Sequence, residues 1–145
     1  RRFRRVPSGI RWTQVPLGND SLTALGTAHP DLQRLIKLVS QYVDAGALRY
    51  AGITDITVLC GYRDKAGQDK AVKDKASKVS WPNSKHNRMP SDAVDVAVYP
   101  VNYKDKGYAA KMAVLHAFIC GVAARLGIDL FNIDWDMPHI QRNVP

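Results

Sequence analysis

Two long segments of the chain carry apolar residues at the spacing of a helix with one buried face. In residues 30–46 these positions follow an i, i+3, i+4 pattern, and Pro30 and Gly46 suit the first turn and the stop of such a helix. Residues 108–126 carry a second apolar stripe, which ends at Gly127. The pattern therefore predicts two core helices.

Strands are predicted where β-branched residues concentrate or alternate with other residues. Residues 53–60 form one such segment and end before Gly61. Residues 93–98 alternate three valines with Ala, Asp and Ala, which is the period of a strand. Two shorter strands are expected over residues 128–133 and 139–141.

The remaining segments are short or polar. We expect a short helix over residues 20–25, an exposed charged helix over residues 66–78, and a proline-containing loop over residues 80–92. These elements predict an α+β fold with a small, mostly antiparallel sheet flanked by three or four helices. We expect one domain over residues 19–145, after an irregular basic segment over residues 1–18.

Composition agrees with one folded, basic domain. The chain has 145 residues, of which 46% are apolar, and a net charge of 21 − 13 = +8. A small basic protein tends to bind a polyanion, such as nucleic acid or an acidic envelope polymer. No continuous run of about 18 apolar residues is present, so no membrane-spanning helix is expected. Cys60 and Cys120 lie in apolar runs and are expected to be buried thiols without a disulfide.

His86 and Asp95 are the first pair of candidate functional residues. His86 lies in the proline-containing loop, and Asp95 interrupts an apolar strand nine residues later. Burying a carboxylate in such a strand is costly unless a cation compensates its charge. The alternation also permits the ordinary alternative, in which Asp95 lies on a solvent-facing side of the strand.

A second candidate group is Asp136-Met137-Pro138-His139, near the end of the sequence. Two histidines and one carboxylate, with a fourth position left open, are typical of a catalytic zinc site. A further carboxylate that does not bind the metal can serve as the general base for the attacking water. Taken alone, His139 is more typical of an ordinary surface histidine, and the HExxH motif of common metalloproteases is absent.

Together these motifs resemble the VanY-like zinc peptidases, which include D-alanyl-D-alanine carboxypeptidases and L-alanyl-D-glutamate endopeptidases of bacterial peptidoglycan. The resemblance rests on Ser84-Lys85-His86, Ala93-Val94-Asp95 and Asp136-Met137-Pro138-His139, with Gly61-Tyr62-Arg63 and Gln68 upstream. Residues 21–25 and 29–32 also resemble the opening helices of the phage endopeptidase branch.

The resemblance implies one zinc ion per chain. The implied zinc ligands are His86, Asp95 and His139. It implies Asp136 as general base and acid, and Arg63 as the group that stabilises the developing oxyanion or holds a substrate carboxylate. Ser84 and Gln68 would belong to the substrate-binding shell.

Two acidic residues are rivals to these assignments. The spacer before Asp95 is two residues longer than the compact version of the family pattern and lacks its glycine, which makes Asp92 a rival ligand. Asp92 lacks the alanine two residues before it, so Asp95 is preferred. Asp134 is a rival to Asp136 as the base, but the three-residue step to the following histidine favours Asp136.

The function that the resemblance implies is that of a phage endolysin, a zinc endopeptidase that hydrolyses the L-alanyl-D-glutamate bond of the murein stem peptide. The alternatives are a D-alanyl-D-alanine carboxypeptidase and a non-enzymatic basic module that binds nucleic acid. We expect a monomer with no stable nucleic-acid partner and with transient contacts to the anionic envelope. No signal peptide is visible after the arginine-rich start. The expected location is therefore the host cytoplasm before release, with action in the periplasm or cell wall.

Overall fold

The structure is a computed structural model that describes residues 14–131 and 136–145. The helices in these residues are α1 (Asn19–Gly26), α2 (Pro30–Asp44), α3 (Lys65–Lys73) and α4 (Tyr108–Leu126). The strands are β1 (Ile56–Cys60), β2 (Ala93–Val98), β3 (Leu130–Phe131) and β4 (His139–Arg142). Two single-turn 3₁₀ helices, η1 (Arg49–Ala51) and η2 (Lys85–Asn87), complete the elements of the described part.

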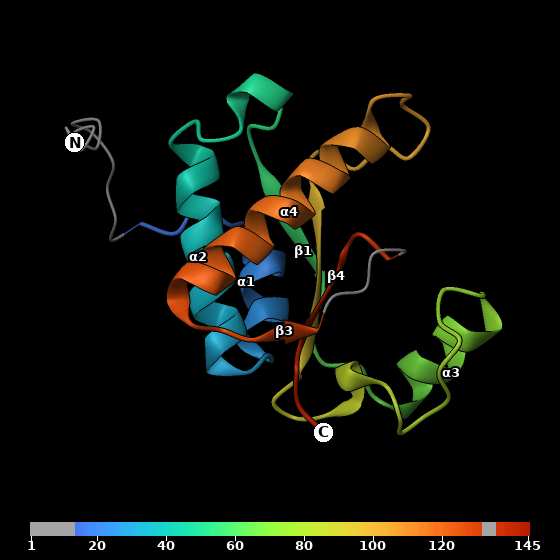
Figure 1. Ribbon diagram of the computed structural model, residues 1–145. Coiled ribbons are helices and arrows are strands. Elements are labelled where there is room, and N and C mark those ends of the chain that lie inside the picture. Colours follow the sequence, from blue (N-terminus) through green and yellow to red (C-terminus); the bar gives the residue numbers. More distant parts are fainter. Residues whose placement is uncertain (1–13, 132–135) are drawn as a thin grey trace.

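The four strands form one antiparallel sheet in the order β1-β2-β4-β3. Helices α1 and α4 contact the sheet and α2 packs against both of these helices, so the three gather on one side (Figure 1). The predicted α+β fold, with a small antiparallel sheet and four helices in a single domain, is confirmed. The proposed domain boundary stays a prediction, because most of the basic segment 1–18 lies outside the described residues.

Local sequence signals explain the two long helices. Pro30 occupies the first turn of α2, and the His29 side chain accepts a hydrogen bond from the backbone N–H of Asp31. Gly46 has a φ of +92°, a conformation that costs glycine least, just after α2 ends. Gly127 caps α4 in the left-handed conformation, so α4 has the bounds that the apolar stripe predicts.

The sequence predicts no membrane-spanning helix, but α4 is a candidate by length and hydropathy. It is 19 residues long and reaches a mean hydropathy of 1.5, so it is long and apolar enough by length and composition. In the structure it contacts α2 and β2, and it buries Met112, Leu115 and Ile119 in the core. One face of the helix therefore packs on the core.

Three element boundaries differ from the sequence prediction. The charged helix expected over residues 66–78 ends at Lys73, because Lys75 takes a left-handed φ of 61° and turns the chain. The first strand begins at Ile56 rather than residue 53. The third strand is described only over Leu130–Phe131, since residues 132–135 lie outside the described part.

Residues 61–92 form a polar extension that we call the α3 arm. Figure 1 shows α3 and the loop after it apart from the group formed by α1, α2 and α4. The buried residues of the arm are Gly61, Gln68, His86, Asn87, Ser91 and Asp92, none of which is apolar. The apolar core is built from residues before and after the arm. The arm is therefore held to the domain by polar contacts.

Candidate metal centre

Strand register brings three side chains with metal-binding chemistry into one row. Asp95 of β2 lies opposite Cys60 of β1 and opposite His139 of β4. Residues directly opposite each other in an antiparallel sheet project from the same face. A bulge between Val58 and Cys60 shifts the register of β1, so that the cysteine rather than Leu59 is paired with Asp95.

His86 reaches the same place from the α3 arm, on the turn η2. Ser84 caps this turn by accepting the backbone N–H of His86, and the backbone N–H of Arg63 donates to the His86 carbonyl at 2.8 Å. The segment around Arg63 is itself fixed by Gly61. A Cβ at Gly61 would lie 2.2 Å from the carbonyl oxygen of Ala24, so only glycine fits there.

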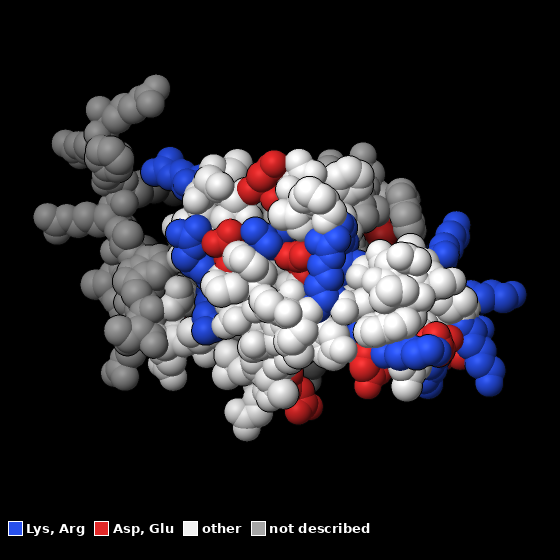
Figure 2. All heavy atoms as spheres, turned by 90° about the horizontal axis from the view of Figure 1, so that it is seen from below, with Lys and Arg blue, Asp and Glu red and all other residues white. Residues whose placement is uncertain are grey.

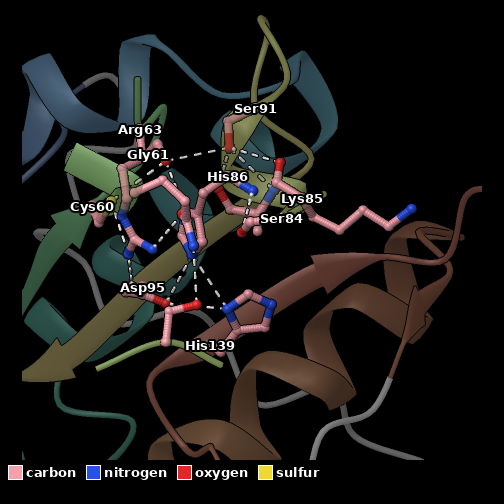
Figure 3. Close-up of polar contacts among 12 residues, drawn as sticks. Cys60, Gly61, Arg63, Ser84, Lys85, His86, Ser91, Asp95 and His139 are labelled. Carbon is pink, nitrogen blue, oxygen red and sulfur yellow. Dashed lines mark hydrogen bonds and ion pairs between the residues drawn. The ribbon is translucent and has the colours of Figure 1, made fainter. Parts of the chain in front are cut away.

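The nitrogen and oxygen atoms of His86, Asp95 and His139 form an equilateral triangle (Figure 3). His86 Nε2, His139 Nδ1 and Asp95 Oδ1 are each 3.3 Å from the other two. Tetrahedral zinc with bonds of about 2.0–2.1 Å requires neighbouring ligand atoms to lie about 3.3 Å apart. These three groups therefore match three corners of a tetrahedral zinc site.

In each histidine, the ring nitrogen that faces away from the triangle has a hydrogen-bond partner, and these hydrogen bonds also suit metal binding. His86 Nδ1 lies 2.7 Å from the carbonyl oxygen of Gly61, and only a protonated nitrogen can donate there. His139 Nε2 lies 2.9 Å from Oε1 of Gln141. Each partner directs one ring proton outward and leaves the other nitrogen of the neutral ring with its lone pair toward the triangle. Metal-binding histidines in proteins are usually oriented by contacts of this kind.

Without a metal, the charges of the triangle stabilise one another. Burial alone would lower the pKa of His86, but hydrogen bonds to Asp95 and Cys60 raise the pKa to about 10. Burial would raise the pKa of Asp95, and the hydrogen bonds from His139 and His86 instead hold that pKa well below its usual range. The metal-free site thus retains protons that a metal must displace, since a metal binds neutral imidazole.

Cys60 was expected to be a buried thiol, and instead it lies half-buried beside the triangle. The donor atoms of Cys60, His86 and Asp95 lie within 4.8 Å of one another, and a group of this composition could hold a metal ion. Burial alone would raise the pKa of the Cys60 thiol, but the hydrogen bond with His86 and the charges of His86 and Arg63 lower the pKa overall. Cys120, also half-buried, forms no disulfide.

Arg63 lies at the edge of the triangle, and a hydrogen bond to the buried Gln68 side chain orients its guanidinium group. Its Nη2 is 3.7 Å from Asp95 Oδ2, and its Nη1 donates to Oε1 of Gln68 at 3.0 Å. Gln68 is 0% exposed and lies behind Arg63, and its predicted place in the substrate-binding shell stays a prediction. The amide acts through Arg63 and through the loop that follows α3, because its Nε2 donates to Ser77 and to the carbonyl of Val79.

Asp136 stands at the start of the turn that carries His139. The backbone N–H of His139 donates to the Asp136 carbonyl, and the turn is tied to β2 by a 2.8 Å hydrogen bond from Val96 N to Pro138 O. The Asp136 side chain is partly exposed, and burial, followed by the charge of Asp95, raises the pKa of its carboxyl group. A raised pKa suits a group that must accept a proton and release it. The rival base Asp134 lies outside the described residues.

The triangle opens into a cavity of about 400 Å³. Its lining includes Arg63, Ser84, Asp136 and the three residues of the triangle, together with the loop Lys75–Val79. The rival ligand Asp92 is engaged elsewhere, since its carboxylate pairs with Arg142 at 2.7 Å and with Arg88 at 3.0 Å. The structure thus brings together the predicted site residues except Gln68, which lies behind the others. Their roles as ligands and catalysts stay predictions.

Four contributors to this site were not predicted from the sequence. Cys60 precedes the Gly-Tyr-Arg motif directly, which was the one signal available for it. Gln141 and Asn87 each sit one or two residues from a histidine of the triangle, and neither has a distinctive spacing. Asn87 donates to the Arg63 carbonyl and to Gln68 Oε1, both at 3.0 Å. Most of the loop Lys75–Val79 falls within the charged helix that the sequence predicts over residues 66–78.

The fold and the donor atoms together are those expected of a metal-dependent hydrolase, and a comparison of structures points the same way. The chain is similar to the crystal structure of Serratia marcescens L-Ala D-Glu endopeptidase ChiX, with a TM-score of 0.58 and 29% sequence identity. The match covers 85% of this chain and 86% of that chain. No protein-family model and no curated protein sequence matches the chain.

Proposed function

We propose that this protein is a zinc-dependent peptidase that hydrolyses the L-alanyl-D-glutamate bond of the peptidoglycan stem peptide. The triangle of His86, Asp95 and His139 carries the proposal, because its 3.3 Å edges fit tetrahedral zinc and leave the fourth position facing a cavity. The choice of bond is supported by the similarity to the Serratia marcescens endopeptidase. A bound zinc ion would supply Lewis-acid activation of the water and of the scissile carbonyl.

The remaining steps fall to side chains of this chain. Asp136 lines the cavity with a raised pKa, and as general base it takes the proton of the attacking water. The same carboxyl group then gives the proton to the leaving amine of D-glutamate. The Arg63 guanidinium, oriented by Gln68, binds the negative charge that develops on the carbonyl oxygen. Ser84 holds the turn that carries His86, and it also borders the cavity.

The experiment is a digestion of purified muropeptides by zinc-loaded protein, followed by mass spectrometry of the fragments. Cleavage between L-alanine and D-glutamate is the expected result, and it should be lost on chelation and restored by zinc. Release of the terminal D-alanine alone would assign the chain to the carboxypeptidases instead. A protein that leaves muropeptides intact and binds DNA in a salt-sensitive, metal-independent way would be the basic nucleic-acid-binding module.

The biological role that we propose is that of a phage endolysin. Its support is the resemblance of residues 21–25 and 29–32 to the opening helices of the phage endopeptidase branch. Such a protein accumulates in the host cytoplasm and acts on the periplasmic wall after release. Expression in a host whose inner membrane is then permeabilised should cause lysis, and expression alone should not. Lysis that also requires intact Asp136 would tie this role to catalysis.

A further inference from the structure

The loop after α3 contributes a positively charged wall to the cleft, and this wall has no part in the mechanism above. Residues Lys75 to Val79 line the same cavity as the triangle. The acidic residues in the described lining are Asp95 and Asp136, which come from the sheet and from the turn before β4. The cleft thus has its acidic groups on the metal side and lysines on the side of the α3 arm.

The cations of the lining differ in where their side chains lie. Arg63 is held by Gln68, and Lys85 donates through Nζ to the carbonyl of Val144 at 2.9 Å. Figure 3 shows the Lys85 side chain pointing away from the triangle. Lys75 and Lys78 are exposed, and Figure 2 shows Lys and Arg side chains projecting at the α3 end of the molecule. Because both lysines are exposed and line the cavity, they are well placed to meet a bound anion.

The backbone at Lys75 gives a second, independent reason to assign it a function. Lys75 has a φ of 61°, and it is the one non-glycine residue of the described chain with positive φ. It follows the C-cap of α3, where glycine or asparagine is usual because a Cβ is strained in this conformation. Residues in sparsely populated backbone conformations cluster at active sites and ligand-binding sites, so this conformation suits a residue that serves the cleft.

The loop is also fixed relative to the catalytic groups. The buried amide of Gln68 donates to Ser77 Oγ at 3.0 Å and to the carbonyl of Val79, while its oxygen accepts Arg63 and Asn87. Every donor and acceptor of this amide is used. One side chain therefore sets the position of the lysine-bearing loop and of Arg63 together, as a shared binding surface requires.

We propose that Lys75 and Lys78 form a carboxylate-binding subsite that recognises the anionic part of the stem peptide beyond the scissile bond. This inference rests on the proposed function, because D-glutamate and the following diaminopimelate supply the carboxylates. The lysines hold the peptide across the cleft while its scissile carbonyl lies at the triangle. Because both side chains are exposed, each contact should contribute modestly to binding.

The test compares two stem peptides, one with free carboxylates and one in which the carboxylates of D-glutamate and diaminopimelate are amides. Lys75→Gly and Lys78→Ala should each raise KM for the free-acid peptide about three- to fivefold, with little change for the amidated peptide. Lys75→Gly should also leave thermal stability unchanged or higher, because it removes the backbone strain. The matched control is Lys73→Ala, an exposed lysine of α3 that does not line the cavity.

Equal KM changes for the two peptides, or an equal change in Lys73→Ala, would overturn the subsite. Wild-type protein that cuts neither peptide would contradict the proposed function instead. In that case the dissociation constants of the two peptides for the zinc-loaded protein, measured by calorimetry, decide the subsite alone. Discrimination in favour of the free acid that disappears in Lys75→Gly supports it, and identical affinities reject it.

Discussion

The helix-and-sheet core is stabilised by burial of apolar side chains, whereas the α3 arm is stabilised by hydrogen bonds between polar groups. The core buries leucine, isoleucine and valine side chains from α2, α4 and the sheet. In the arm, residues 61–92, the buried groups are glycine or polar, and Gln68 at their centre uses every donor and acceptor of its amide. Apolar burial tolerates small shifts, whereas a hydrogen-bonded network depends on geometry.

The candidate metal centre lies where these two regions meet. Asp95 and His139 belong to core strands, while His86 belongs to the arm. A metal bound by all three would therefore clamp the arm to the sheet. We therefore expect substitutions in the core to change the free energy of unfolding, and substitutions in the arm to change metal binding and catalysis.

Removal of a ligand should break the clamp and have the largest effect. We expect His86→Ala and His139→Ala to lose zinc and activity entirely, and Asp95→Asn to bind zinc more weakly, because a neutral amide is a poorer ligand. Metal analysis of the purified variants measures this directly. Amide hydrogen exchange should accelerate in residues 61–92 and stay slow in α2. His29→Ala is the control and should keep its zinc. If His86→Ala and His139→Ala both retained one zinc per chain, the assignment of these ligands would be wrong.

Substitution of the base should leave the clamp intact and remove the chemistry. Asp136→Asn keeps the shape of the side chain but cannot accept a proton at neutral pH. We expect this variant to fold, to bind zinc nearly normally and to lose about 10²–10⁴-fold in kcat. Asp134→Asn is the control and should stay active. If Asp134→Asn alone were inactive while it still held zinc, the role of base would move to Asp134.

A pair of substitutions tests the contrast between core and arm directly. Leu35→Ala removes a fully buried side chain of α2, and we expect it to cost about 2–5 kcal/mol of unfolding free energy with little change in kcat/KM of the folded protein. Gln68→Met keeps the volume but leaves Arg63 and Asn87 without their acceptor. It should cost about 1–3 kcal/mol and lower kcat/KM by about 10–100-fold. Denaturant unfolding and steady-state kinetics separate the two, and equal kinetic losses would reject the division.

The pH dependence of stability should have opposite signs in the metal-free and in the zinc-loaded protein. In the metal-free protein the pKa of His86 is raised to about 10, so its stabilisation is complete below about pH 6.5 and declines as the pH rises toward 10. Asp95, with a lowered pKa, stabilises above about pH 3.9 and loses this effect in stronger acid. Zinc binding instead strengthens as the pH rises, because it requires neutral histidines.

Urea midpoints measured from pH 6 to pH 9, with and without zinc, should therefore change in opposite directions. His86→Gln is the control, since its metal-free form lacks the titrating ring and should show a flatter profile. A metal-free wild type whose midpoint does not fall over this range would show that the ion pair with Asp95 adds nothing to stability.

The sequence by itself determined those features that depend on near neighbours. The bounds of α4 follow from its apolar stripe and Gly127, because helical periodicity is a local property. The Ser-Lys-His, Ala-Val-Asp and Asp-Met-Pro-His motifs were visible as short strings, and they identified the residues that the structure gathers around one cavity. Fold class followed in the same way from the order of helices and strands.

Only the tertiary structure decided how distant segments meet. The bulge in β1 places Cys60 opposite Asp95. The carboxylate of Asp92, the rival ligand, instead pairs with Arg142, which lies fifty residues further along the chain. The burial of Gln68 depends on a loop that turns back at Lys75, where a left-handed residue ended the predicted helix early. Strand register, ion pairing and burial are set by contacts between segments that no local pattern encodes, so these features could not be predicted from the chain alone.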